Sequence, residues 1–255
     1  MRRFSELHTR SRRLLAGLFC FAAILALLAL PAAADKSPGT DDLAAPDIIK
    51  RMQAVYAGSR SYLDSGMVKE VFIDANGERI VEKPFTTAFV RPHRFRYEFR
   101  ETPAYQAERR FVIHQEGEAL RVHWDLEHEL ELNTLDRAIA AATGVSSESA
   151  ITVPGMLLPG EITWRRAIRF RIPTRIADDM LGNIDCYRIL DRVPGGLVTF
   201  WIGKQDLLLR KTYLERSFDD FRVQRTTSYE PAMNIDIDTR LLRFDPPAKK
   251  PWWRF

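Results

Sequence analysis

The 255-residue sequence contains only two cysteines, Cys20 and Cys186. Cys20 lies in an apolar run near the N-terminus, so Cys186 is alone in the rest of the chain and an internal disulfide is excluded there. A chain of this length can bury enough apolar surface to fold without one. Residues 184–190 alternate as a strand does and contain no histidine, so we interpret Cys186 as a buried structural residue and not a nucleophile.

The sequence also lacks the short motifs that mark common active sites. No G-x-S-x-G, H-E-x-x-H, C-x-x-C or glycine-rich phosphate loop occurs. His123, Asp125 and His128 lie close in sequence, but on a strand His128 would fall on the face opposite the other two. The acidic pairs at 178–179 and 219–220 are expected in turns. We therefore expect no catalytic residue, no metal site and no cofactor.

Beyond the first 34 residues the chain has no excess of either charge. Of its 38 Lys and Arg and its 34 Asp and Glu, five Arg and one Glu precede Asp35, which leaves 33 of each sign. A nucleic-acid-binding domain normally carries a basic surplus. This balance therefore indicates that nucleic acid is not a partner.

Only one hydrophobic run is long, the 17 residues from Leu14 to Leu30. Arginines precede it, and Pro31-Ala32-Ala33-Ala34 follows it. A basic start, a short apolar core and small residues before a polar one are typical of a secretory signal peptide. We predict cleavage after Ala34, hence a signal peptide over residues 1–34. An uncleaved anchor helix is the alternative, because 17 residues are the lower limit for a membrane span.

The exported chain is predicted to open with a flexible, polar leader over residues 35–45. Apolar residues at helical spacing predict an amphipathic helix over 46–58, with Pro46 and Asp47 in its first turn. Its apolar face consists of Ile48, Ile49, Met52, Val55 and Tyr56. The chain ends in an aromatic tail, 248–255, whose Trp252 and Trp253 would either pack on the domain or touch a membrane interface.

From Tyr62 onward the apolar residues recur at every second position, which is typical of strands with one wet face. Asn76-Gly77 predicts a tight hairpin. The clearest alternation places Phe95, Tyr97 and Phe99 on one face. Strands are expected at 62–74, 79–91, 94–100, 110–115, 119–125, 167–172, 184–191, 197–202, 207–216 and 221–229.

An Ala-rich helix at 135–142 and an apolar segment at 154–160 interrupt the strands. The insertion either covers one face of the sheet permanently or acts as a movable lid over an apolar cavity. Because the strands form one series around it, we predict a single α+β domain over 46–247. Its architecture is a large antiparallel sheet curled into an incomplete β-barrel, with an N-terminal helix and an inserted helical lid.

In this order of elements the sequence resembles the LolA-like periplasmic lipoprotein carriers. The Arg-Pro step and aromatic strand within 89–98, the hairpin at 111–120 and the closing Phe244-Asp245-Pro246-Pro247 are similar to features of that superfamily. Residues 182–187 resemble uncharacterised relatives of the carriers.

The resemblance implies a periplasmic, non-enzymatic carrier that holds lipid or lipoprotein acyl chains on a concave apolar face. Arg91 matches the arginine that bonds to the lid in such carriers, so it is our lid-latch candidate. Transient contact with a membrane is also implied. The ligand-binding candidates are apolar residues of the strands and the lid: Phe95, Tyr97, Phe99, Val122, Trp124, Met156, Leu157 and Leu158.

Two other classes of function remain open at this point. The same scaffold could serve as an interaction or sensory domain that binds envelope proteins and no lipid. A hydrolase would require a polar cluster in the cavity, and no residue set in the sequence indicates one.

Overall fold

The computed structural model describes four stretches of the chain: 42–103, 106–125, 132–163 and 170–246. They lie in one compact unit that begins at Asp42. The predicted signal peptide over 1–34, most of the leader over 35–45 and the aromatic tail over 248–255 fall outside the described residues. Those three assignments stay predictions.

The first long element is the helix α2, Ala45–Ala57. Pro46 stands at its start, where a missing N–H costs nothing, and Asp47 favours the positive end of the helix dipole. Ile48, Met52 and Tyr56 recur on one side and are fully buried. The helix is therefore held by packing on the sheet, as its amphipathic pattern predicted.

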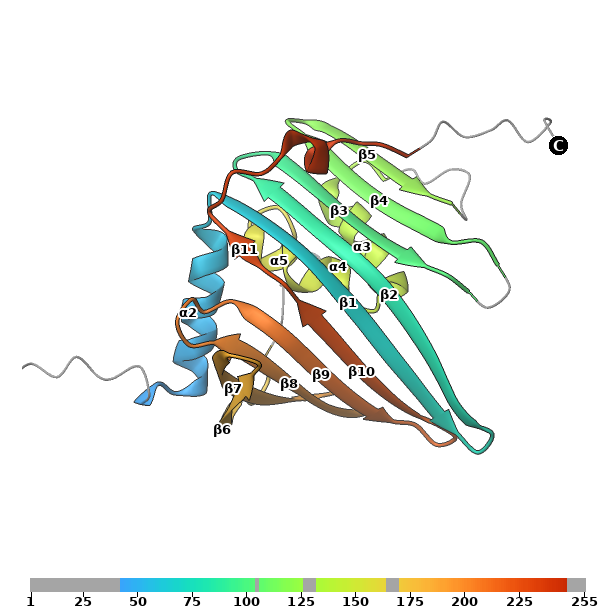
Figure 1. Cartoon of the computed structure of the whole chain (residues 1–255), viewed down its shortest axis with the longest axis vertical. Helices are drawn as coiled ribbons and strands as arrows, with labels where there is room; N and C mark the ends of the chain where they lie inside the picture. The colour runs from blue at the N-terminus through green and yellow to red at the C-terminus, as the bar shows by residue number, and fades with distance from the viewer. Residues whose placement is uncertain (1–41, 104–105, 126–131, 164–169, 247–255) are drawn as a thin grey trace, which may run out of the picture. The chain divides into compact units, whose positions relative to one another are not determined.

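All strands described belong to one antiparallel sheet, which is the predicted architecture (Figure 1). Its spatial order is β5-β4-β3-β2-β1-β10-β9-β8-β7-β6, so two hairpin series meet where β1 pairs with β10. Among the described residues β5 and β6 form the two edges, and the curled sheet is not closed. The strands are β1 Ser61–Asp74, β2 Gly77–Val90, β3 Arg94–Glu101, β4 Arg109–Glu116, β5 Ala119–Trp124, β6 Thr174–Leu181, β7 Ile184–Val193, β8 Gly196–Gly203, β9 Leu209–Ser217, β10 Arg222–Tyr229 and the short β11 Ala232–Met233, which pairs with β1.

The strand predicted at 167–172 is not present over its described part, 170–172. The backbone N–H groups of Arg171 and Ile172 donate to the Asp191 carboxylate, each over 2.8 Å, and so take no part in a strand ladder. The edge strand β6 begins only after Pro173.

The prediction that Asp178 and Asp179 lie in a turn is wrong, because both lie in β6. Partners on the sheet compensate their charges. Asp178 is bound by Lys204 over 2.8 Å, and Asp179 accepts the indole N–H of Trp201 over 3.0 Å. Acidic residues disfavour strands, and these partners, distant in sequence, outweigh that preference.

Between β5 and β6 the described residues include three helices: α3 Leu135–Val145, α4 Ser149–Thr152 and α5 Pro154–Leu157. Thr134 caps α3 by accepting the backbone N–H of Arg137. All three lie against one face of the sheet, behind the strands in Figure 1. We call α3 to α5 the helical insertion and the face that it covers the inner face.

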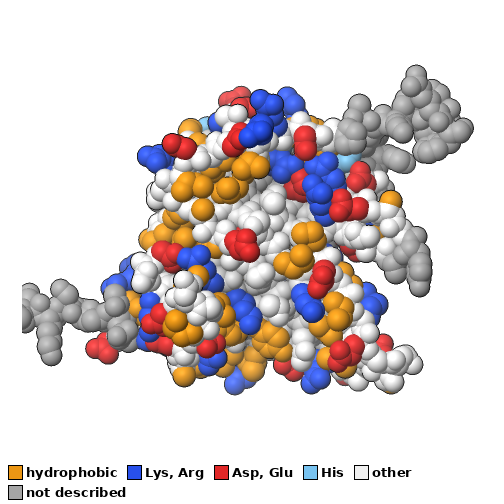
Figure 2. Space-filling view, in the orientation of Figure 1, with side chains coloured by type: hydrophobic (Ala, Val, Ile, Leu, Met, Phe, Trp, Pro, Cys, Tyr) orange, Lys and Arg blue, Asp and Glu red, His pale blue; other side chains and the backbone are white. Residues whose placement is uncertain are grey.

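The outer face of the sheet is wet and carries charges of both signs, visible toward the viewer in Figure 2. Over β3 and β4, Glu98 is almost fully buried beneath arginines: Arg100 binds it over 2.6 Å and Arg110 over 3.0 Å, and Arg96 also contacts it. Burial opposes ionisation of Glu98, but the arginines outweigh it and lower the carboxyl pKa. The basic outer face of β3 is thus a charge-balanced structural cluster.

Candidate functional site

The inner face over β1 to β5 is filled with aromatic side chains. Ring centroids succeed one another from Phe85 to Tyr97 (6.3 Å), Phe99 (6.5 Å), Phe111 (5.7 Å) and Trp124 (5.5 Å). These rings lie on neighbouring strands because residues at every second position share a face. This half of the inner face holds a continuous aromatic layer.

The helical insertion closes over that layer. The hydroxyl groups of Tyr97 and Ser149, the latter in α4, are hydrogen-bonded over 2.6 Å. Met156, Leu157 and Leu158 are buried in the same hydrophobic core as the rings. This half of the inner face is therefore occupied by the protein's own side chains.

The structure brings most of the predicted ligand-binding residues together in that core. Six of them are fully or almost fully buried there: Phe95, Tyr97, Phe99, Met156, Leu157 and Leu158. Val122 and Trp124 are half-buried on β5 and pack against them. A ligand could reach these residues only if the insertion moved away, so a binding role for them stays a prediction.

Arg91 lies where β2 ends and connects three carbonyl groups. Its Nε donates to Ser59 O over 2.9 Å, and its Nη2 donates to Ala57 O over 2.8 Å and to Leu157 O over 3.1 Å. The side chain thus ties the end of α2 to the end of α5. Whether this tie acts as a latch remains a prediction.

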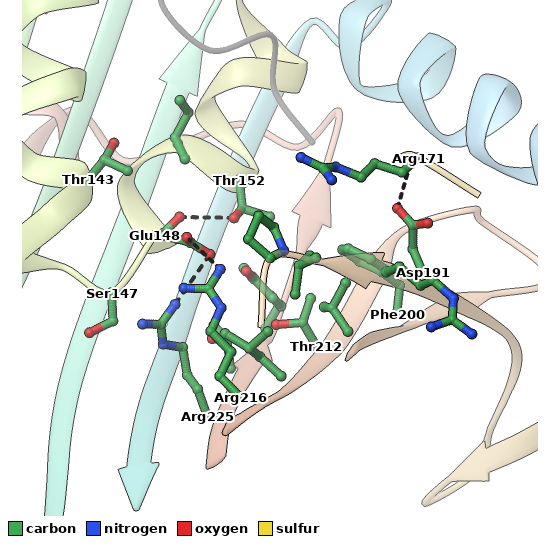
Figure 3. A pocket seen from close by; sticks show the side chains of 18 residues that line it. Thr143, Ser147, Glu148, Thr152, Arg171, Asp191, Phe200, Thr212, Arg216 and Arg225 are labelled. Atoms are coloured by element: carbon green, nitrogen blue, oxygen red, sulfur yellow. Dashed lines mark hydrogen bonds and ion pairs between the residues drawn. The ribbon is translucent and has the colours of Figure 1, made fainter. Parts of the chain in front are cut away.

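The inner face over β7 to β10 is different, because the insertion leaves a cleft of about 500 Å³ there (Figure 3). Its apolar lining includes Val198, Phe200, Leu214 and Tyr229 from the sheet and Ile151 from α4. A volume of this size is typical of small-ligand sites. It is the part of the inner face that a ligand could enter without displacing the core.

Charged residues surround one end of the cleft. Arg216 from β9 and Arg225 from β10 converge on Glu148, which lies between α3 and α4 (Figure 3). Arg225 Nη1 lies 3.2 Å from the Glu148 carboxylate, and Arg216 Nη2 lies 3.9 Å from it. At the other end Asp191 accepts the two backbone N–H groups described above.

Beneath Glu148 a buried carboxylate joins the sheet to the insertion. Glu70 accepts Ser147 Oγ over 2.6 Å and Arg225 Nε over 2.8 Å. Lys83 lies 3.8 Å from Glu70 and donates to Val145 O over 2.8 Å. Burial opposes ionisation of Glu70, yet the nearby cations outweigh it and hold the pKa of the carboxyl below its ordinary value.

Asp64 is a second buried carboxylate on the inner face, between the filled half and the cleft half. It is 1% exposed, and its Oδ1 accepts the backbone N–H of Glu230 over 3.0 Å. Burial raises the pKa of Asp64 to about 7, because the loss of solvation outweighs the hydrogen bonds that favour the charged form. The carboxyl therefore changes its charge near neutral pH.

Neither nucleophile nor metal chemistry has an evident site in the described part of the chain. No group of three or more His, Cys, Asp or Glu residues could hold a metal ion in that part. Cys186 is buried in β7, as predicted, and burial raises the pKa of its thiol to about 11. A thiol with that pKa is almost wholly protonated at neutral pH and is a poor nucleophile.

None of the predicted ligand-binding residues lines the cleft, and the residues that do were missed. Alternation along β9 and β10 places Leu214, Arg216 and Arg225 on one face, but sequence does not tell which face is inner. The sequence did contain one indication of this site: Arg216 and Arg225 each share a strand face with apolar residues. That the two faces form one surface becomes clear only from the pairing of Leu214 with Arg225 in the structure.

No helix of the described residues is long and apolar enough to cross a membrane.

No protein-family model and no curated protein matches this sequence. Solved structures do resemble the fold. The structure of MucB in complex with MucA(peri) matches 79% of this chain and 60% of its own, with 9% identity and a TM-score of 0.43, so this chain spans less than two thirds of it. A DUF1329 family protein from Desulfovibrio piger matches over 77% and 95%, with 10% identity and a TM-score of 0.28.

A LolA superfamily protein from Nitrosomonas europaea is also among the similar structures, as the sequence resemblance led us to expect. The match covers 79% of this chain and 98% of that one, with 11% identity and a TM-score of 0.27. At TM-scores this low, none of these likenesses assigns a function to the chain.

Proposed function

We propose that this protein is a periplasmic, non-enzymatic carrier that binds an acyl chain in the cleft between the helical insertion and strands β7 to β10. The observation that carries this proposal is the cleft of about 500 Å³, whose lining includes apolar side chains, beside a half of the same face that is packed with aromatic rings. Apolar side chains left open in a concave site are typical of binding sites for apolar ligands.

The packing of the helical insertion gives a reason why the inner face over β7 to β10 keeps a cleft. The α3 to α5 helices pack on the rings of β2 to β4, where Tyr97 reaches Ser149. Over β8 to β10 the insertion contributes to the cleft lining only through the end of α3, the bend that follows it and α4, and Phe200 and Leu214 line the cleft from the sheet. An acyl chain laid along this lining would bury apolar surface that the insertion leaves uncovered.

The test is native mass spectrometry of the full chain purified from its own periplasm without detergent. We expect a bound acyl lipid that organic solvent extracts. Val198→Trp fills the cleft from its floor and should abolish the bound mass, and the milder Val198→Phe should reduce it. A wild-type protein that carries no acyl lipid, and that takes none up from mixed-lipid vesicles, would overturn the proposal.

The matched control is Leu197→Trp, one residue away on the same strand. Leu197 is 42% exposed on the outer face, because neighbouring strand residues point to opposite faces. This variant introduces the same side chain into β8 and should retain the ligand. Equal loss in both variants would attribute the effect to damage of the strand and contradict the proposed site.

A further inference from the structure

The charged end of the cleft contains more positive than negative charge. Arg216, Arg225 and Lys83 face two carboxylates, Glu70 and Glu148. Glu70 accepts a hydrogen bond from Arg225 Nε and forms an ion pair with Lys83. Glu148 is therefore the carboxylate that faces both Arg216 and Arg225 on the cleft side.

The contact of Glu148 with these arginines is incomplete. Arg225 Nη1 and Arg216 Nε are buried nitrogen atoms with no hydrogen-bond acceptor among the described residues. Arg225 Nη1 lies 3.2 Å from the Glu148 carboxylate and Arg216 Nη2 lies 3.9 Å from it, each as an ion pair without a hydrogen bond. A guanidinium group gains most from a carboxylate or phosphate that it can bind through two N–H groups, and Glu148 does not supply that geometry.

The Glu148 side chain is also placed so that it can move away from Arg216 and Arg225. Its side chain is 45% exposed, and its φ of 69° follows the φ of 54° at Ser147, so two consecutive residues that are not glycine adopt the left-handed conformation. That conformation is unfavourable for side chains with a Cβ. The backbone of Ser147 and Glu148 is therefore held in this bend by side-chain contacts with the sheet, not by the intrinsic conformational preference of the two residues.

We infer that Arg216 and Arg225 bind the anionic head group, a phosphate or carboxylate, of an amphiphile whose acyl chain lies along the cleft. Glu148 occupies this position in the absence of ligand, and the ligand's anion replaces it. The inference rests on the proposed function and specifies its ligand class. The apolar lining begins next to the arginines, since Leu214 pairs directly with Arg225, so head and chain would be adjacent.

The test compares three amphiphiles with the same myristoyl chain, below their micelle concentrations, by isothermal titration calorimetry on the full exported chain. Lysophosphatidic acid and myristate carry the anion, and monomyristoylglycerol is neutral. Inorganic phosphate alone is the fourth probe. We expect the two anionic amphiphiles to bind at least about tenfold more tightly than the neutral one, and inorganic phosphate to bind far more weakly.

Two variants should shift anion binding in opposite directions. Arg216→Gln should weaken binding of the anionic amphiphiles by about tenfold and leave the neutral one unchanged. Glu148→Gln removes the competing carboxylate and should tighten anion binding several-fold, which a merely damaged protein would not do. Arg222→Gln is the control, since Arg222 is exposed and pairs with Glu215 over 3.7 Å.

The outcomes separate the inference from the proposed function. Equal affinity for anionic and neutral amphiphiles, with no effect of Arg216→Gln, would overturn the head-group site and leave the acyl carrier intact. Tight binding of inorganic phosphate alone would show a free-anion site and also overturn the inference. Failure of every amphiphile to bind would overturn both.

Discussion

At the scale of single residues, Asp64 is the most unusual group in the described chain. It lies on β1 with its carboxylate in the core, beside Tyr62. Acidic residues are rarely buried without a cationic partner. Ionisation of the Asp64 carboxyl therefore destabilises the folded state.

This destabilisation predicts a contribution of Asp64 to stability that falls as the pH rises. The folded protein holds the Asp64 proton up to about pH 7, whereas the unfolded chain releases it near the ordinary aspartate pKa of 3.8. Between those values the folded state binds more protons at Asp64, so the contribution of Asp64 to the free energy of unfolding decreases from about pH 4 to about pH 7 and is flat above it. Each unit of raised pKa corresponds to about 1.4 kcal/mol, so the total is a few kcal/mol.

Asp64→Asn should remove most of this slope, and at pH 8 the variant should be more stable than the wild type. Urea unfolding at pH 5, 6, 7 and 8 measures both. Asp136→Asn is the control, because that side chain accepts the exposed N–H of Thr163 and should leave the slope in place. An Asp64→Asn profile with the same pH dependence as the wild type would contradict the assignment.

Sequence could not reveal Asp64, because a single acid in an alternating strand is equally compatible with either face. The same limit applies to Glu148, whose left-handed backbone no local pattern indicated. Cys186 was predictable because Ile184, Tyr187 and Ile189 mark its segment as a strand with a large apolar share. The position of a residue can be predicted from sequence when its type suits its environment. It cannot be predicted when distant partners hold the residue in a burial state or backbone conformation that its type disfavours.

At the scale of elements, hydrophobic periodicity predicted α2 and most strands to within two residues. Both strand ends at the Asn76-Gly77 hairpin were predictable, because turn chemistry fixes the pairing of β1 with β2. The failure was β6. Its position depends on Asp191 binding the chain at 171–172 and on Lys204 binding Asp178, and both partners lie far away in sequence.

The link between elements that is easiest to test is Arg91. Arg91→Gln removes donors to Ala57 O and Leu157 O, so the end of α5 should exchange its amide hydrogens faster. Because the side chain is exposed, we expect a loss of only about 1 kcal/mol in unfolding free energy. Hydrogen exchange resolved to residues 154–158 is the measurement.

Arg94→Gln is the matched control for Arg91. Arg94 lies three residues away and contacts Glu116 on a neighbouring strand over 3.5 Å, with no carbonyl of the insertion among its described partners. It should leave exchange in α5 unchanged. Unaltered exchange in Arg91→Gln would mean that packing of Leu157 alone holds α5, and that Arg91 is no latch.

At the scale of the whole molecule, the inner face is divided into a filled half and an open half. The resemblance read from the sequence pointed to β3 and the insertion as the ligand-binding surface, whereas the open lining lies on β8 to β10. Sequence could predict an apolar inner face on both series of strands. How far the insertion extends across it depends on packing between elements, which periodicity does not encode.

This division makes a prediction about where the molecule responds to its ligand. If myristoyl lysophosphatidic acid enters the cleft, hydrogen exchange should slow in β8 to β10 and stay unchanged in β3 and α5, because the aromatic layer is not opened. The free energy of unfolding should rise with ligand concentration, by about 2.7 kcal/mol at a hundred times the dissociation constant. Faster exchange in β3 and α5 would instead mean that the insertion lifts and that the chain binds among Phe95, Tyr97 and Phe99. In that case the aromatic layer is the binding surface, and the closed arrangement is its resting state.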